Sequence, residues 1–157
     1  HPDREYDMLC SNIENFKLIN DILGVPAGDQ LLISVAEMIQ EKIGERGICG
    51  RLSADQFACL IRRPQAYPQE YFIHANSEIN TLANMQNVVV KWGVYVIRDK
   101  QVSVEQMCDR ALLAVRRIKG QYNNYVAAYD DTLRNKLLRE QAITDSMEAA
   151  LKELTKR

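Results

Sequence analysis

Residues 12–29 read NIENFKLINDILGVPAGD, and this stretch decides how the first part of the chain folds. Its apolar residues recur at the spacing of one helix face, which predicts a short helix that ends at Gly24. Residues 25–28 are expected to form a connector. A short strand is predicted directly before the helix, at residues 6–11. The apolar helix positions are Phe16, Ile19 and Leu23.

Beyond this stretch, the hydrophobic pattern alternates between the spacing of helices and that of strands. Residues 88–97 give the clearest strand, because β-branched valine favours extended backbone. The predicted order is β-α-α-β-β-α-β-α-β-α, with a hairpin between crossover helices. A single helix-covered sheet of the α+β class (an α/β sandwich) with a ferredoxin-like core fits this order. The other expected helices end at residue 43 or span 68–83, 104–118 and 132–156, and the other strands are 48–52, 56–62 and 124–129.

The composition predicts one folded domain with balanced charge. The 157 residues carry 20 Lys and Arg against 21 Asp and Glu, which excludes the basic excess typical of nucleic-acid binding. No apolar run reaches the roughly 18 residues of a membrane helix, so no membrane contact is expected. The sequence does not start with methionine, which predicts that it is a piece of a longer protein.

None of the four cysteines belongs to a CxxC pair or has the spacing of a zinc site. Three of them lie in strand-like runs, where cysteine behaves as a small buried hydrophobe. We therefore expect structural thiols and a cytoplasmic location. His1 and His74 are far from any candidate nucleophile, so no Ser-His or Cys-His pair is predicted. The cysteines are Cys10, Cys49, Cys59 and Cys108.

A second informative stretch is RLSADQFACLI, residues 51–61, where two strand-like flanks meet in a tight turn. Ser53, Ala54 and Asp55 occupy the turn. Hairpin turns favour glycine, for which a positive φ costs little. An alanine here, followed by an acid beside an amide, indicates that the turn was shaped by something other than strand connection.

Both stretches resemble the signatures of GGDEF domains. Residues 12–29 are similar to D-I-D-x-F-K-x-I-N-D-x-x-G-H-x-x-G-D, and residues 51–57 align with R-x-G-G-D-E-F. CDRALLAVRRIKG, residues 108–120, resembles the family's A-D-x-A-L-Y-x-A-K segment. The family comprises bacterial diguanylate cyclases, which join two GTP molecules into cyclic di-GMP. The resemblance covers essentially the whole chain and implies the GGDEF, nucleotidyl-cyclase-like fold, with a mostly antiparallel five-stranded sheet flanked by helices.

The resemblance implies that the hairpin is the remnant of a metal and phosphate site. In working members, its glycines let a triphosphate approach the backbone, and carboxylates hold two divalent cations. Here Asn12 and Gln56 replace two of the three site carboxylates, and only Asp55 remains. Because magnesium favours carboxylates, Asp55 with Asn12 and the backbone of Ile13 is expected to hold Mg²⁺ weakly. Asp55 and Gln56 are thus predicted to be vestigial, and no cofactor is assigned firmly.

The resemblance also implies a guanine nucleotide site. Asn20 and Asp29 match the family residues that read the guanine edge, and Lys17 and Arg116 match positions that contact phosphates. Phe16 is included in the predicted nucleotide site. Ordinary roles stay open: a late-helix position for Asn20, a helix cap for Asp29, and solvated surface cations for Lys17 and Arg116.

Further departures from the family also indicate a degenerate domain. The product-feedback motif R-x-x-D has Gly44 and Gly47 at its two charged positions, and the histidine of the first signature is Val25.

The end of the chain resembles a connection to another domain. Residues 1–131 are predicted to be the degenerate GGDEF domain, and residues 132–157 a linker helix. REQAITDSMEAALKELTKR, residues 139–157, resembles the helix that joins GGDEF to EAL phosphodiesterase domains, and its apolar residues form one stripe. The implied partners are an EAL-like domain of the same protein, GTP, and a second copy in a homodimer.

The leading expectation is a catalytically inactive regulatory domain of bacterial cyclic di-GMP signalling, which binds GTP and modulates an EAL phosphodiesterase. Two alternatives stay open. One is a weak metal-dependent diguanylate cyclase centred on Asp55. The other is a purely structural module for dimerisation or transmission.

Overall fold

The computed structural model describes residues 4–156, so His1 lies outside the described part. The order of elements is the predicted one. The elements are β1 (Tyr6–Ile13), α1 (Phe16–Leu23), α2 (Val25–Ile43), the 3₁₀ turn η1 (Gly44–Arg46), β2 (Gly47–Ser53), β3 (Gln56–Arg62), α3 (Gln69–Ala83), β4 (Val90–Val96), α4 (Val104–Ile118), β5 (Val126–Ala128) and α5 (Asp131–Thr155).

The strands form one sheet in the order β2-β3-β1-β4-β5. β1 lies at the centre and pairs antiparallel with β3 and β4, and β2 pairs antiparallel with β3. β5 adds to β4 in parallel. The first four strands with α2 and α3 make a β-α-β-β-α-β core, so the predicted mostly antiparallel sheet and ferredoxin-like core are confirmed.

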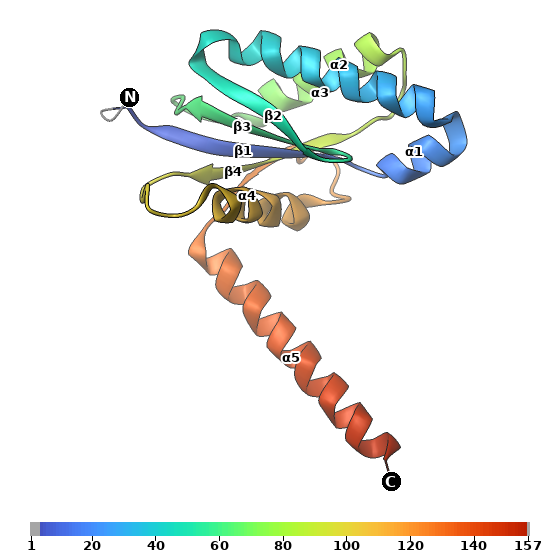
Figure 1. The fold of residues 1–157 in the computed structure, drawn as a ribbon, viewed down its shortest axis with the longest axis vertical. Coiled ribbons are helices and arrows are strands. Elements are labelled where there is room, and N and C mark those ends of the chain that lie inside the picture. The colour runs from blue at the N-terminus through green and yellow to red at the C-terminus, as the bar shows by residue number, and fades with distance from the viewer. Residues whose placement is uncertain (1–3, 157) are drawn as a thin grey trace.

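Helices cover both faces of the sheet, as predicted: α2 and α3 lie on one face and α4 on the other (Figure 1). Because strand residues alternate between faces, Leu9 and Trp92 join the core under α2 and α3, and Met8 joins the core under α4. Gly93 lets α4 approach β4 closely, since a Cβ there would overlap the carbonyl of Ala111.

The predicted connector at residues 25–28 is wrong, because those residues form the first turn of α2. Gly24 is the N-cap, and Pro26 lies at the start of the helix, where a missing N–H costs nothing. Gly24 has a φ of 94°, so it separates α1 from α2 without a loop. β1 also continues to Ile13, and α1 begins later than predicted, at Phe16.

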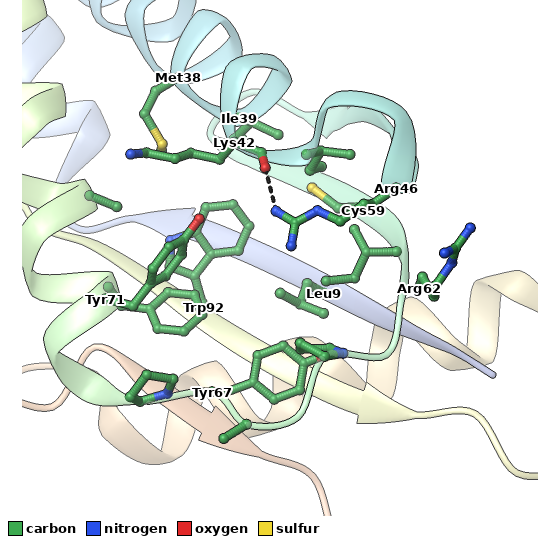
Figure 2. Close-up of a pocket in the computed structure, with 17 residues that line it drawn as sticks. Leu9, Met38, Ile39, Lys42, Arg46, Cys59, Arg62, Tyr67, Tyr71 and Trp92 are labelled. Carbon is green, nitrogen blue, oxygen red and sulfur yellow. Dashed lines mark hydrogen bonds between the residues drawn. The ribbon is translucent and has the colours of Figure 1, made fainter.

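α5 extends away from the rest of the chain (Figure 1). Among its described residues, Leu133 in the first turn is the buried one. Between α2, α3 and the sheet, the core leaves a cavity of about 170 Å³ (Figure 2). The helix predicted at residues 132–156 is confirmed as an element, and its role as a linker stays a prediction.

Candidate functional site

Three polar side chains form a row across one end of the sheet. Asn12 of β1 pairs in register with Gln56 of β3 on one side and with Lys91 of β4 on the other. Strand residues in register on neighbouring strands share a face, and Met8 and Cys10 of β1 place this face under α4. The row therefore holds two amides and one cation at the positions around the predicted metal site.

The hairpin turn between β2 and β3 forms without glycine. Ser53 pairs with Gln56 across it, and no residue of the turn has a positive φ among the described residues. The register shifts between Arg51 and Ser53, which marks a bulge. Arg51 then closes the turn, since its Nε donates to the carbonyl of Ser53 (3.1 Å) and its Nη2 to that of Ala54 (2.9 Å). Arg51 thus stabilises a turn that alanine tolerates.

The donor atoms at this turn do not fit a pair of divalent cations. Asp55 is the one carboxylate among the three matched positions, and within residues 4–156 no group of three or more His, Cys, Asp or Glu side chains could hold a metal. Gln56 Oε1 accepts a hydrogen bond from the Ser53 hydroxyl (3.0 Å). The backbone N–H of Ile13 donates to the carbonyl of Asp55 (3.2 Å), so β1 and the turn are held together by protein groups. Weak Mg²⁺ binding at Asp55 stays a prediction.

The predicted guanine-reading residues lie on the α1–α2 pair. A Cβ at Gly28 would overlap Asn20 Oδ1 and lie 3.4 Å from Phe16 Cζ, so these three residues are in contact. Asn20 Oδ1 is buried and has no hydrogen-bond partner within the described part of the chain. Asp29 is exposed on the next residue of α2. The alternative role of Asp29 as a helix cap is wrong, because Gly24 caps α2.

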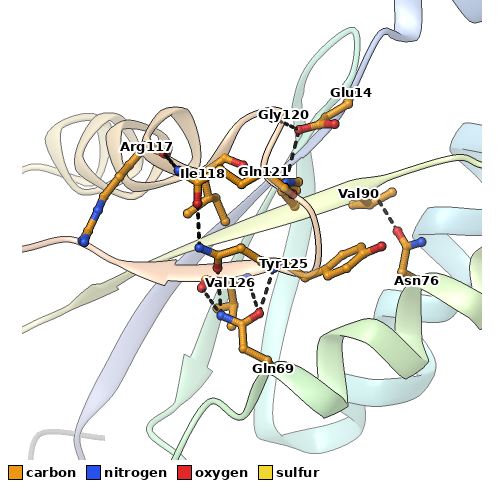
Figure 3. A network of polar contacts seen from close by, with 12 residues as sticks. Glu14, Gln69, Asn76, Val90, Arg117, Ile118, Gly120, Gln121, Tyr125 and Val126 are labelled. Atoms are coloured by element: carbon orange, nitrogen blue, oxygen red, sulfur yellow. Dashed lines mark hydrogen bonds and ion pairs between the residues drawn. The ribbon is translucent and has the colours of Figure 1, made fainter.

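The two cations assigned to phosphate contacts lie on different elements. Lys17 is exposed on α1, and Arg116 is exposed in the last turn of α4, on the other face of the sheet. Arg116 is nevertheless near the end of the sheet that carries Asn12, because Glu14 Oε1 accepts a hydrogen bond from the N–H of Gly120 just beyond α4 (2.8 Å; Figure 3).

Lys91 is a residue that the sequence analysis missed. Its side chain is 2% exposed, and its Nζ donates to the carbonyl of Ile118 (2.7 Å) and to that of Gln121. Glu14 Oε1 lies 3.6 Å from the same nitrogen. Ile118 is the last residue of α4, and Gln121 lies in the segment that follows, so Lys91 binds carbonyls at and just beyond the negative end of the helix. The sequence signal that could have identified Lys91 is its position as a lone lysine in a valine-rich strand.

Amide side chains of α3 hold two neighbouring strands (Figure 3). Gln69 Oε1 accepts from the N–H of Tyr125 (2.8 Å) and of Val126 (3.2 Å), and its Nε2 donates to the carbonyl of Val126 (2.8 Å). Asn76 Oδ1 accepts from the N–H of Val90 (2.7 Å). α3 is thereby fixed to β4 and β5 beside the site, which no periodicity in the sequence could have indicated.

The cysteines are free thiols within the described residues, and Cys10, Cys59 and Cys108 are buried. Burial raises the pKa of Cys10 and of Cys59 far above the usual value of 9.0, so both stay protonated. This environment suits small core residues, as the sequence predicted, and gives none of the thiolate character that catalysis or metal binding needs.

The family model for "Diguanylate cyclase, GGDEF domain" matches residues 1–125. The chain therefore belongs to the GGDEF family, and its fold is the one the signatures implied.

Among curated proteins, the chain is similar to the cyclic di-GMP phosphodiesterase PdeB of Shewanella oneidensis, with 28% identity over 126 residues, which is 76% of this chain and 15% of that protein. It is 39% identical over 59 residues to the bifunctional diguanylate cyclase/cyclic di-GMP phosphodiesterase MucR of Pseudomonas aeruginosa, covering 38% of this chain and 9% of MucR. The chain thus spans a small part of these relatives.

Solved structures show the same fold. The active GGEEF domain of a diguanylate cyclase from Vibrio cholerae matches with a TM-score of 0.62 and 21% identity, covering 81% of this chain and 84% of that one. The GGDEF domain of TpbB from Pseudomonas aeruginosa matches with a TM-score of 0.65 and 21% identity, covering 86% and 83%. Over the described residues, no helix is both long and apolar enough to cross a membrane.

Proposed function

We propose that this GGDEF domain is a catalytically silent sensor of GTP in cyclic di-GMP signalling, and that it regulates an EAL-type phosphodiesterase domain of the same protein. The proposal rests on a difference between two parts of the site in which family residues they retain. The catalytic end keeps only Asp55 of the three carboxylates, while the α1–α2 pair keeps Asn20 and Asp29, the residues that the resemblance assigns to guanine.

Catalytic silence follows from charge. Joining two GTP molecules builds negative charge around an α-phosphate, which divalent cations neutralise. Asn12 and Gln56 supply neutral oxygens at two of the three carboxylate positions, and Gln56 Oε1 already accepts from Ser53. Removal of one preorganised stabiliser typically costs about 10²–10³ in rate, so the loss of two leaves turnover below detection.

Guanine binding is supported by Asn20. A buried polar atom without a partner costs about 1–3 kcal/mol, and a ligand donor that reached Asn20 Oδ1 would recover this free energy. Asn20 of α1 contacts Gly28 of α2, and Asp29 follows Gly28 directly. An amide and a carboxylate therefore lie close together on neighbouring helices. Guanine carries N–H donors beside a carbonyl, and this pair of side chains suits it better than adenine.

Calorimetric titration of the chain with GTP and with ATP is the test. We expect GTP to bind and ATP to bind at least tenfold more weakly, with little dependence on Mg²⁺. Asp29→Ala should weaken GTP about tenfold, which corresponds to roughly 1.4 kcal/mol. Asp21→Ala, which removes an exposed acid of α1, is the matched control and should leave GTP affinity unchanged. Equal and negligible heats for both nucleotides would favour a purely structural module instead.

Regulation of an EAL domain is supported by the C-terminal helix and by the relatives. PdeB and MucR are named as cyclic di-GMP phosphodiesterases, and each is much longer than this chain. α5 carries an exposed apolar stripe that its own domain leaves uncovered, so a neighbouring surface is its natural contact. A GTP-dependent role of this kind places the domain in the cytoplasm. The stripe comprises Ile143, Met147, Leu151 and Leu154.

A further inference from the structure

The cavity between α2, α3 and the sheet has an apolar interior in which aromatic rings lie among aliphatic side chains. Trp92 of β4, Phe72 of α3 and Cys59 of β3 border it, and each is buried in the surrounding core. Figure 2 shows Trp92 and Tyr71 beside the space, with Met38 and Ile39 of α2 on the far side. Phe72 and Trp92 lie at a tilted angle with their ring centroids 6.1 Å apart. A flat apolar group would find ring faces and edges to pack against.

The polar groups beside this interior are already satisfied. The hydroxyl of Tyr67 donates to Asp7 Oδ2 (2.6 Å), so Tyr67 offers the cavity its ring rather than its oxygen. Burial raises the pKa of Cys59, which keeps that thiol neutral. Asp7 itself is fully buried and also accepts from Arg63 Nε (2.8 Å). The interior therefore has little to offer a polar ligand such as a nucleotide base.

The rim of the cavity is positively charged. Lys42, Arg46 and Arg62 line it, and no acid does so within the described residues. Lys42 is engaged with Glu78 of α3 (3.0 Å), and Arg62 points away from the space in Figure 2. Arg46 donates through Nη2 to the carbonyl of Lys42 (2.6 Å), which fixes its guanidinium at the rim and leaves its other N–H groups without a partner in the described chain. Arg46 is thus the cation that is placed to receive an anion.

We infer that this cavity binds a small carboxylate that carries one aromatic ring, with the ring inside and the carboxylate on Arg46. The size fits, because an engineered apolar cavity of about 150 Å³ takes up benzene and this one measures about 170 Å³. The chemistry fits as well, because ligand pockets are mostly apolar with few charged groups, and arginine forms strong charge-assisted bonds with carboxylates. The site lies at the far end of α2 from Asp29, so it is separate from the proposed nucleotide pocket.

Trp92 makes the binding directly measurable, because it is the sole tryptophan of the chain and borders the cavity. We expect 3-phenylpropionate to change Trp92 fluorescence with a saturable curve. The neutral 3-phenylpropionamide should bind at least tenfold more weakly, since it lacks the charge that Arg46 recognises. Saturating GTP should leave the curve unchanged, which separates this site from the nucleotide pocket whether or not GTP binds.

Variants locate the ligand. Arg46→Gln should weaken 3-phenylpropionate about tenfold, whereas Arg117→Gln, an exposed arginine on the other side of the sheet, should not. Ala75→Leu, which fills the cavity from α3, should abolish binding, and circular dichroism checks that this variant folds. If it does not fold, the acid–amide pair and Arg46→Gln still decide the question. A non-saturable signal, equal affinity for acid and amide, or no effect of Arg46→Gln overturns the inference.

Discussion

The side-chain oxygen of Asn20 occupies the space that a Cβ on residue 28 would need. Gly28→Ala should therefore displace Asn20 and α1, although alanine is the better helix former by about 1 kcal/mol. Overpacking of this kind typically costs about 1–3 kcal/mol, so we expect a net loss of stability in urea denaturation and a loss of GTP affinity. Gly50→Ala is the control, because a Cβ at Gly50 meets no atom within 4 Å. Unchanged stability and GTP affinity in Gly28→Ala would contradict the tight contact.

Restoring the acids should restore metal binding. We expect the wild-type chain to make no cyclic di-GMP from GTP with Mg²⁺ or Mn²⁺. The double variant Asn12→Asp, Gln56→Glu adds two carboxylates in register on β1 and β3, and should bind Mn²⁺ at least tenfold more tightly in calorimetry. Adding Asp55→Ala to that variant should remove much of the gain. Wild-type cyclase activity that Asp55→Ala abolishes would instead establish the weak enzyme.

Buried Lys91 should contribute more to stability than a lysine at the protein surface does. Lys91→Met removes the Nζ donor from the carbonyls of Ile118 and Gln121 and takes away the cation beside Glu14, so we expect a loss of about 3 kcal/mol, typical of breaking a buried pair. Lys42→Met is the matched control. It removes a partly exposed pair with Glu78 and should cost less than about 1 kcal/mol. Equal losses in urea denaturation would show that burial of Lys91 is not decisive.

The chain should lose stability in alkaline solution. Burial raises the pKa of Cys10 and Cys59 above 9.0 and that of Tyr67 above 10.0, so the folded state keeps protons that the unfolded state releases. Stability is then full below about pH 9 and falls as pH rises, by up to about 1.4 kcal/mol per pH unit for each group. Urea denaturation between pH 7.5 and 10.5 measures the slope. Cys59→Ala should make it shallower, while Tyr122→Phe, at an exposed tyrosine, should not.

α5 should transmit the state of the nucleotide site in the full-length protein. Two glycines inserted after Thr144 break a helix that contains neither glycine nor proline, and should uncouple the domains while leaving each folded. Typical couplings of about 1–3 kcal/mol correspond to a 5–150-fold change in a neighbour's activity. A phosphodiesterase response to GTP that is identical with and without the insertion would exclude this role.

The order of elements and the sheet could be predicted because strong periodicities and two signatures specify them. The ends of the elements are harder to predict from sequence, as residues 25–28 show. The proline and glycine there predict a connector, yet both fit the start of helix α2. The site was predictable only where its residues lie close in sequence. Lys91, Glu14 and Gln69 act through partners far along the chain, and the cavity beside Trp92 depends on how α2 and α3 pack, so no local pattern could reveal them.

Gln69 has a mechanical consequence. β5 is three residues long and is followed almost at once by α5, so tension or torque on α5 reaches β5 first. β5 pairs with β4, and the segment at its start is hydrogen-bonded to Gln69 in the first turn of α3. A force on the C-terminal helix is therefore transmitted both to the sheet and to α3, which lines the cavity.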